Sequence, residues 1–136
     1  MPQGHFDVNT NGRREFIDLS GRMRTLVQKS GIQDGLLVLY NPHTTAGLTI
    51  NEGADPDVQR DILDALARLV PDAQHYRHLE GNSPAHVMAS LTGSSISVII
   101  QQGQLQLGTW QRIFFCEFGG PRRRTLRWLL MADHSS

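Results

Sequence analysis

The stretch from Leu36 to Tyr40, LLVLY, decides the class of fold that this chain adopts. All five positions are apolar, whereas a strand with one solvated face would alternate apolar and polar residues. A second stretch, from Trp110 to Phe118 (WQRIFFCEF), is also apolar on both parities around its centre. We therefore expect two strands that are covered on both faces and lie centrally in β-sheet.

Shorter strands are expected outside these two. The runs Ile96–Ile100 and Leu105–Leu107 are apolar and brief, and residues 43–51 alternate in polarity. One face of the alternating strand carries Thr44, Ala46, Leu48 and Ile50, and the other carries His43, Thr45, Gly47, Thr49 and Asn51. Residues 125–131 fit a helix by propensity or a last strand by burial, and their periodicity does not decide between the two.

The N-terminal residues predict a β-hairpin. Residues 5–8 and 15–19 flank the sequence Asn9-Thr10-Asn11-Gly12. An Asn-Gly pair supplies the positive φ angles that tight hairpin turns need.

Three helices follow from capping residues and helical spacing. Ser20 can cap a helix that ends at Gly31, Asp55-Pro56 can start a second that stops before Pro71, and Ser83-Pro84 can start a third that ends near Gly93. Their expected buried residues are Met23, Leu26 and Val27, then Val58, Ile62, Leu66 and Leu69, then Val87, Met88 and Leu91.

These elements predict an α/β (α+β) fold, with β-sandwich-like mixed sheets and two or three helices. The 136 residues suffice for one domain spanning residues 1–136. Its C-terminal tail, residues 133–136, is expected to be disordered.

Charge and composition exclude several classes of partner. Thirteen Lys+Arg balance thirteen Asp+Glu, so the chain as a whole does not attract nucleic acid or an anionic membrane. The longest apolar run is far shorter than the roughly 20 residues of a membrane span, and no apolar signal-peptide region is present. A single cysteine, Cys116, forbids an internal disulfide. We expect a cytoplasmic protein without nucleic-acid or membrane partners.

Four loops are rich in side chains that coordinate or hydrogen-bond ligands. They comprise residues 43–45, 51–55, 78–83 and 108–111. Turns and helix caps have the same composition, so residue types alone leave both interpretations open.

Three blocks within and around these loops resemble the YjbQ-type family, also called secondary thiamine-phosphate synthases. The blocks are His43–Pro56, His78–His86, and Gly103–Gln111 together with Phe115–Phe118, and the resemblance runs from about residue 5 to residue 131. It implies a small α/β fold with a β-sandwich, a homotrimer, a metal-supporting site lined by histidines, and a weak thiamine-phosphate synthase activity. The chain departs from the family pattern at Arg112, where a small residue, usually glycine, is common, and at Gly119, where an acidic residue is common.

Three histidines are the candidate metal ligands. Neutral imidazoles from His43, His78 and His86 would leave a fourth position open, as in catalytic zinc sites. Zinc is the expected divalent ion, with magnesium or manganese as alternatives. His75 is a less favoured substitute for His78, and the alternative interpretation is that all these rings are hydrogen-bonded turn or cap residues.

Glu52 and His86 are the candidate catalytic residues. Glu52 either moves protons or merely stabilises the start of the helix at Asp55, and the sequence favours neither. Candidate substrate-binding residues are Thr44, Thr45, Asn51, Asn82, Ser83, Thr109, Gln111 and Arg122. Glu117 lies in an apolar strand and needs a cation, either Arg122 or a metal-bound histidine. Cys116 is expected to be an inert core thiol.

The expected function is a metal-supported reaction on small phosphorylated metabolites. In its most concrete form, hydroxymethylpyrimidine diphosphate and a thiazole phosphate give thiamine phosphate and diphosphate. The alternatives are a metal-dependent hydrolase of a small ester or phosphate, and a non-catalytic trimeric protein that binds a metabolite or a metal. Self-association would also cover strands that a 15 kDa domain cannot hide alone.

Overall fold

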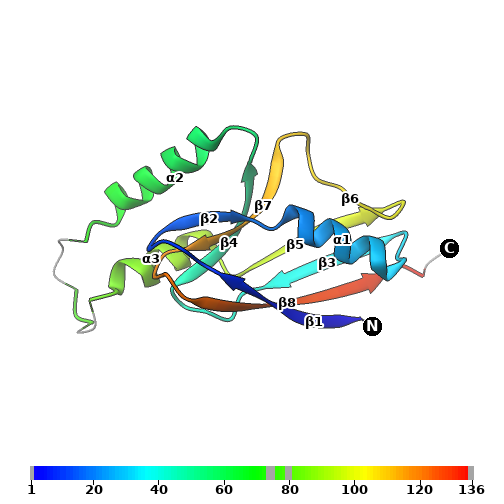
Figure 1. Ribbon diagram of the computed structural model, residues 1–136, viewed down its shortest axis with the longest axis horizontal. Helices are drawn as coiled ribbons and strands as arrows, with labels where there is room; N and C mark the ends of the chain where they lie inside the picture. Colours follow the sequence, from blue (N-terminus) through cyan, green and yellow to red (C-terminus); the bar gives the residue numbers. More distant parts are fainter. Residues whose placement is uncertain (1, 73–75, 79–80, 135–136) are drawn as a thin grey trace.

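The computed structural model describes residues 2–72, 76–78 and 81–134 (Figure 1). Along the chain its elements are β1 (Gln3–Asn9), β2 (Glu15–Asp18), α1 (Ser20–Ser30), β3 (Gly35–Tyr40), β4 (Ala46–Glu52), α2 (Pro56–Leu69), α3 (Ser83–Thr92), β5 (Ser95–Gln101), β6 (Gln104–Leu105), β7 (Gln111–Glu117) and β8 (Arg123–Ala132).

Two antiparallel sheets face one another. The larger sheet has the order β1-β8-β3-β5-β6, and the smaller sheet has the order β2-β7-β4. Leu37 and Leu39 of β3 meet Ile113 and Phe115 of β7 in one buried cluster, to which α1 adds Met23 and Val27. The α+β, sandwich-like prediction is therefore confirmed, except that every strand pair is antiparallel and neither sheet is mixed.

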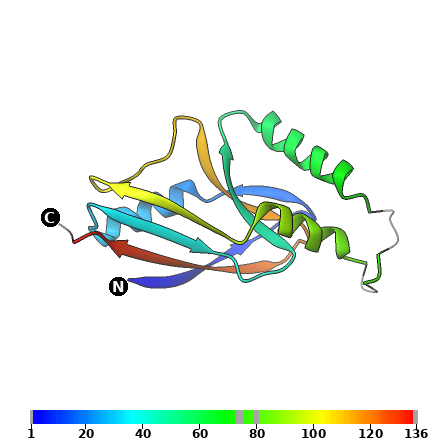
Figure 2. The same ribbon diagram turned by 180° about the vertical axis from the view of Figure 1, so that it is seen from behind.

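Strand β7 is buried on both faces, as its sequence predicts. Its second face, with Phe114 and Cys116, packs against Met88 of α3 and against Leu63 and Leu66 of α2. Figures 1 and 2 show the smaller sheet lying between α2 and the larger sheet.

Strand β3 is central but only half covered. It lies between β8 and β5, with Leu37 and Leu39 fully buried. On its other face Tyr40 is 47% exposed. Ile99 of β5 and Met131 of β8 extend this exposed apolar face, so the prediction of cover on both sides is wrong for a single chain.

The predicted N-terminal hairpin is wrong. Strand β1 pairs with β8 and strand β2 pairs with β7, so the two strands lie in different sheets. The chain crosses between the sheets after Asn9, where the Thr10 N–H donates to the Arg122 carbonyl at 3.0 Å. Gly12 has no positive φ, so the tight turn that would pair the strands does not form.

Burial decides the structure of the C-terminal segment that the sequence left ambiguous. Residues 125–131 belong to β8, since Leu126 and Leu130 face the core between β1 and β3.

Ser20 is not the cap of α1: its N–H donates to Asp18 Oδ1, and its own Oγ accepts from the Ile113 N–H. The predicted stop at Gly31 is confirmed by its left-handed φ of 74°.

Helices α2 and α3 begin where predicted but bury other side chains. Asp55 caps α2 by accepting from the Asp57 N–H, yet no α2 residue is fully buried and Leu69 is 73% exposed. In α3 only Met88 of the predicted set is buried, because the face that meets the smaller sheet also carries Ala85 and Ala89. Val87 and Leu91 of the predicted buried set are exposed.

None of the helices in the described residues is long and apolar enough to cross a membrane.

At the C-terminus the Asp133 N–H donates to the Asp34 carbonyl at 2.8 Å. Residues 135 and 136 lie outside the described residues, and the disordered tail stays a prediction.

Candidate functional site

A hollow of about 530 Å³ opens between the segment before β4, helix α3 and the turn that leads into β5. Its lining brings together two of the three predicted metal ligands, from segments far apart in the sequence. The lining residues are His43, Thr44, Ala46, His86, Ala89, Ser90, Gly93 and Ser94.

His43 lies in a loop, not on the strand face where its sequence pattern places it, because β4 begins only at Ala46. The buried side chain of Asn41 forms the loop. Its Oδ1 accepts from the His43 N–H at 3.0 Å, and its Nδ2 donates to the Ala46 carbonyl at 2.8 Å. An Asn before proline at the end of a strand is a turn signal that was available in the sequence.

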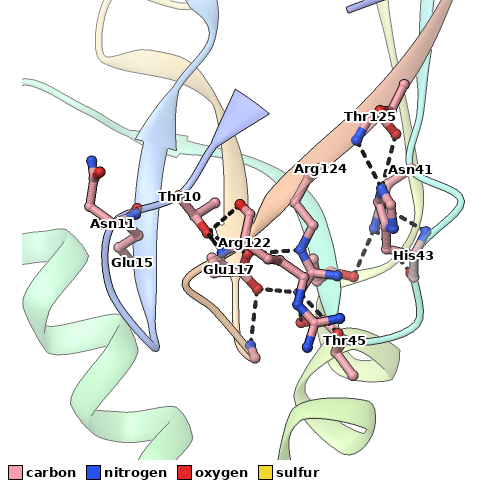
Figure 3. Close-up of polar contacts among 12 residues, drawn as sticks. Thr10, Asn11, Glu15, Asn41, His43, Thr45, Glu117, Arg122, Arg124 and Thr125 are labelled. Atoms are coloured by element: carbon pink, nitrogen blue, oxygen red, sulfur yellow. Dashed lines mark hydrogen bonds and ion pairs between the residues drawn. The ribbon is translucent and has the colours of Figure 1, made fainter. Parts of the chain in front are cut away.

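The His43 ring reaches across to β8 (Figure 3). Its Nε2 lies 3.0 Å from the Thr125 backbone nitrogen and 3.1 Å from the Thr125 carbonyl oxygen. Burial, and then the positive charge of Arg124, lower the pKa of His43, so the neutral ring is favoured. When Nε2 donates to the carbonyl, Nδ1 keeps a free lone pair, which is the form that binds a metal.

His78 and His86 also contact one another. Their ring centroids are 5.5 Å apart, with the rings nearly perpendicular. His86 is the fourth residue of α3 and lines the same hollow as His43. Within the described residues, however, no group of three or more His, Cys, Asp or Glu side chains is close enough to hold a metal ion. The three-histidine site stays a prediction, and His75 lies outside the described residues.

The start of α3 borders this region. Asn82 precedes the helix, and its Oδ1 is buried with no hydrogen-bond partner among the described residues. Ser83 and Pro84 form the first turn. A Cβ built on Gly119 would lie 3.1 Å from the Cβ of Thr45 and 3.6 Å from that of Ala85. Gly119 therefore lies close to Thr45 and to Ala85 in the first turn of α3, and a side chain at this position would require Thr45 to shift slightly.

A buried ion pair lies beneath these loops. Glu117 is 0% and Arg124 1% exposed, and Arg124 Nε donates to Glu117 Oε2 at 2.8 Å while Nη2 donates to Oε1. The same carboxylate accepts from Thr10 Oγ1 at 2.9 Å and from the Gly119 N–H at 3.0 Å. Burial alone would raise the pKa of Glu117, but these hydrogen bonds outweigh it and the pKa lies below its usual value.

The partner of Glu117 is Arg124, and the predicted partners were wrong. Arg122 is exposed, and it contributes its backbone N–H to Thr10 Oγ1 at 2.9 Å. Arg124 shares its strand face with Leu126 and Leu130, so it points into the molecule. This alternation could have identified it once residues 125–131 were assigned to a strand.

Thr45 lies below the hollow and not in its wall. It is 6% exposed, and its Oγ1 and carbonyl oxygen accept from Arg124 Nη2 at 2.9 and 3.2 Å. In the structure Thr45 thus contacts the buried guanidinium, and its substrate contact stays a prediction. Thr44 is exposed and does line the hollow.

The remaining candidates lie at the other end of β4. Glu52 pairs with Gln111, six residues and about 20 Å along the strand from Ala46. Glu52 Oε2 accepts from the Asp55 N–H at 3.0 Å. Of the two roles considered for Glu52, proton transfer and stabilisation of the helix start, this contact belongs to the second. Within one chain, this end of β4 does not lie near the histidines. The candidates at this end are Asn51, Glu52, Thr109 and Gln111.

Cys116 is fully buried, and burial raises the pKa of its thiol. The thiol therefore stays protonated in the core of the smaller sheet, as the sequence predicts.

Comparisons with known proteins match nearly the whole chain. Residues 4–133 match the model of the family described as UPF0047 protein YjbQ-like. A UPF0047 protein of Methanocaldococcus jannaschii is 47% identical over 128 residues, which cover 94% of this chain and 93% of that protein. The UPF0047 protein YugU of Bacillus subtilis is 48% identical over 119 residues, with 87% and 90% covered.

Solved structures agree with the fold. The crystal structure of a YjbQ/UPF0047 family protein from Clostridium acetobutylicum has a TM-score of 0.91 at 49% identity, covering 93% of this chain and 98% of that one. A hypothetical protein from Aeropyrum pernix has a TM-score of 0.92 at 36% identity, covering 98% and 100%.

Proposed function

The chain belongs to the YjbQ-like UPF0047 family, and from that premise we propose that it is a metal-supported enzyme acting on small phosphorylated metabolites. In its most specific form the proposal is thiamine-phosphate synthesis: hydroxymethylpyrimidine diphosphate and a thiazole phosphate give thiamine phosphate and diphosphate. The observation that carries it is the shared hollow of His43 and His86, with His78 in ring contact beside it. We place this activity in the cytoplasm, where the free thiol of Cys116 stays reduced.

The donor set fits zinc better than magnesium or manganese. His43, His78 and His86 would be the ligands, and imidazole suits zinc, whereas magnesium and manganese prefer oxygen. The neutral ring of His43 supports this assignment, because its Thr125 contact can hold the proton on Nε2 and leave Nδ1 free. A bound divalent ion would supply positive charge against the departing diphosphate.

The chain's own groups would orient the phosphates. The start of α3 lies near the histidines, and helix N-termini favour anions. Pro84 has no N–H, and the N–H groups of Ala85 and His86 donate to the Asn82 carbonyl at 3.0 and 3.4 Å, so this helix end would act on a phosphate through its dipole. Arg122 is exposed, and its charge is felt at His43, where it helps to lower the pKa. We assign Arg122 the role of an outer phosphate contact.

We propose that the protein is a homotrimer and that neighbouring copies complete each site. The apolar face with exposed Tyr40, Ile99 and Met131 and half-buried Leu36 and Val38 is the surface that a second copy would cover. Glu52 lies about 20 Å along β4 from the hollow of its own chain. Its role as acid or base therefore requires that the Glu52 end of one copy meets the hollow of the next.

Diphosphate release from the two substrates tests this function. We expect Glu52→Gln to keep fold and bound zinc while lowering turnover by about 10²–10⁴-fold, the usual effect of losing general acid–base catalysis. Mixed assemblies of Glu52→Gln and His86→Ala copies should recover part of the activity, because some sites then combine two intact halves. A full-rate Glu52→Gln protein with a lower melting temperature would reduce Glu52 to a helix stabiliser.

The same assay separates the alternatives. Turnover of a phosphate ester by the zinc-loaded protein, without joining of the synthase substrates, would favour a hydrolase. Retained zinc with no turnover of either substrate class would favour a metabolite- or metal-binding protein.

A further inference from the structure

The segment that carries His43 is held from beneath by two consecutive residues of β8. The Arg124 guanidinium donates to Thr45 Oγ1 at 2.9 Å and to the Thr45 carbonyl at 3.2 Å. The backbone of the next residue, Thr125, contacts His43 Nε2. Figure 3 shows these contacts on one side of the ion pair and those of Thr10 on the other.

We propose that Glu117 and Arg124 are positioning residues, which set the geometry of the hollow by fixing its two walls to one buried ion pair. The proposal rests on the proposed function in one respect, that the hollow is the functional site. Neither residue lines the hollow, so any effect on a ligand passes through the groups that they hold.

The first wall is formed by His43 and Thr44, and Thr45 lies directly beneath it. A guanidinium is planar and presents several donors in a fixed arrangement, so one Arg124 can bind the Glu117 carboxylate and Thr45 at the same time. Thr45 is thereby fixed, and His43 lies two residues before it.

The second wall is helix α3. Glu117 Oε1, which also accepts from Arg124 Nη2, accepts from the Gly119 N–H at 3.0 Å. Gly119 lies against both Thr45 and Ala85, and Ala85 belongs to the first turn of α3, one residue before His86. The same carboxylate therefore fixes the surface on which His86 is carried.

Stability alone does not account for this arrangement. Replacing a buried ion pair by apolar side chains of similar volume is often neutral or stabilising. What the pair supplies is directional bonds, reaching Thr45 on one side and Gly119 on the other, which apolar side chains do not provide.

The third branch of the network offers a matched control. Thr10 Oγ1 donates to Glu117 at 2.9 Å, as Thr45 accepts from Arg124, and both threonines are 6% exposed. Thr10 belongs to the segment that crosses between the sheets and does not line the hollow. Thr10→Val and Thr45→Val each remove one buried hydroxyl from the same ion pair, and only Thr45 adjoins a wall of the hollow, directly after Thr44. Thr10→Val also removes the acceptor of the Arg122 N–H.

The test is the nitrogen NMR spectrum of the histidine rings, with His43→Gln and His86→Gln used to assign the signals. We expect Thr45→Val to shift and broaden the His43 ring signals, since its contact with Thr125 is no longer fixed. Thr45→Ser, which keeps the hydroxyl, should restore the wild-type spectrum, and Thr10→Val should leave it unchanged. An unchanged Thr45→Val spectrum, equal disturbance by Thr10→Val, or failure of Thr45→Ser to restore the signals would overturn the proposal.

A binding measurement extends the test to the proposed function. With zinc alone as the probe, we expect the dissociation constant to rise at least about tenfold in Thr45→Val and to change less than about twofold in Thr10→Val. Equal rises in the two variants would contradict positioning. If the wild-type protein binds no zinc, the proposed function fails, while the ring spectra still decide whether Glu117 and Arg124 position the walls.

Discussion

The two ends of strand β4 both carry ligand-type side chains, but only one end has buried support. At the Ala46 end, the 43–45 loop is tied to Asn41, Arg124 and the backbone of Thr125. At the Glu52 end, the side-chain hydrogen bonds among the described residues are short-range ones, such as those of Glu52 with Asp55 and of Gln111 with Gly108. The comparison teaches that residue types propose a site, whereas long-range buried bonds give it a fixed shape.

The largest difference between the ends should appear on removing a buried charge. Glu117→Ala leaves Arg124 uncompensated in the interior, and we expect the free energy of unfolding to fall by about 3–5 kcal/mol. Glu52→Ala removes one partly exposed helix-approach contact and should lower it by about 0.3–1 kcal/mol. Urea unfolding measures both values, and similar losses in the two variants would abolish the contrast.

A smaller difference is expected for the two amides. Asn41→Ala removes a buried side chain that accepts from His43 and donates to Ala46, and we expect a loss of about 1–3 kcal/mol. Gln111→Ala affects an exposed amide and should stay within about 0.5 kcal/mol of wild type. Thermal unfolding of the two variants ranks their stabilities. A Gln111→Ala variant that melts below Asn41→Ala would contradict the conclusion that the Ala46 end of β4 is the better supported end.

The smallest expected effect is in the dependence of the free energy of unfolding on pH, on the acid side of the curve. The folded pKa of Glu117 lies below its ordinary value, so its ionised form stabilises the fold above a pH of about 4.3 and this contribution is lost as the pH falls through the lower folded pKa. One such group changes the free energy of unfolding by at most about 1.4 kcal/mol per pH unit.

The double variant Glu117→Gln/Arg124→Met removes both charges and should flatten the acid side of the curve. Asp72 also has a pKa lowered by hydrogen bonds from Arg13 and Arg14, but Asp72 and Arg13 are exposed and screened by salt, so high-salt measurements reduce its contribution relative to that of Glu117. An acid side as steep in the double variant as in wild type would mean that other carboxyls dominate it.

Much of the fold was predictable because it depends on local pattern. The apolar runs identified β3 and β7 as central strands, and Gly31, Asp55 and Gly93 marked helix ends that the structure has. Sheet membership was not predictable in this way. Residues 3–9 and 15–18 have strand character in either topology, and only the partner strands β8 and β7 decide that they do not form a hairpin.

The site was predictable in its residue types but not in its grouping. His43 and Glu52 are only nine residues apart in the sequence. Strand β4 lies between them and is extended, so its Ala46 and Glu52 ends are about 20 Å apart. Conversely, Glu117 and Arg124 meet across a turn, and the alternation of β8 places Arg124 inward only once residues 125–131 are assigned to a strand. Topology, and not composition, decides which polar residues become neighbours.

The most direct test of the account is the zinc content of the purified protein, measured on His86→Ala beside the control His134→Ala. His86 lines the hollow with His43, whereas His134 is exposed near the C-terminus. We predict close to one zinc ion per chain in wild type and in His134→Ala, and a sharp loss in His86→Ala because three protein ligands leave little reserve. Equal zinc content in all three proteins would contradict the assignment of this end of β4 as the functional site.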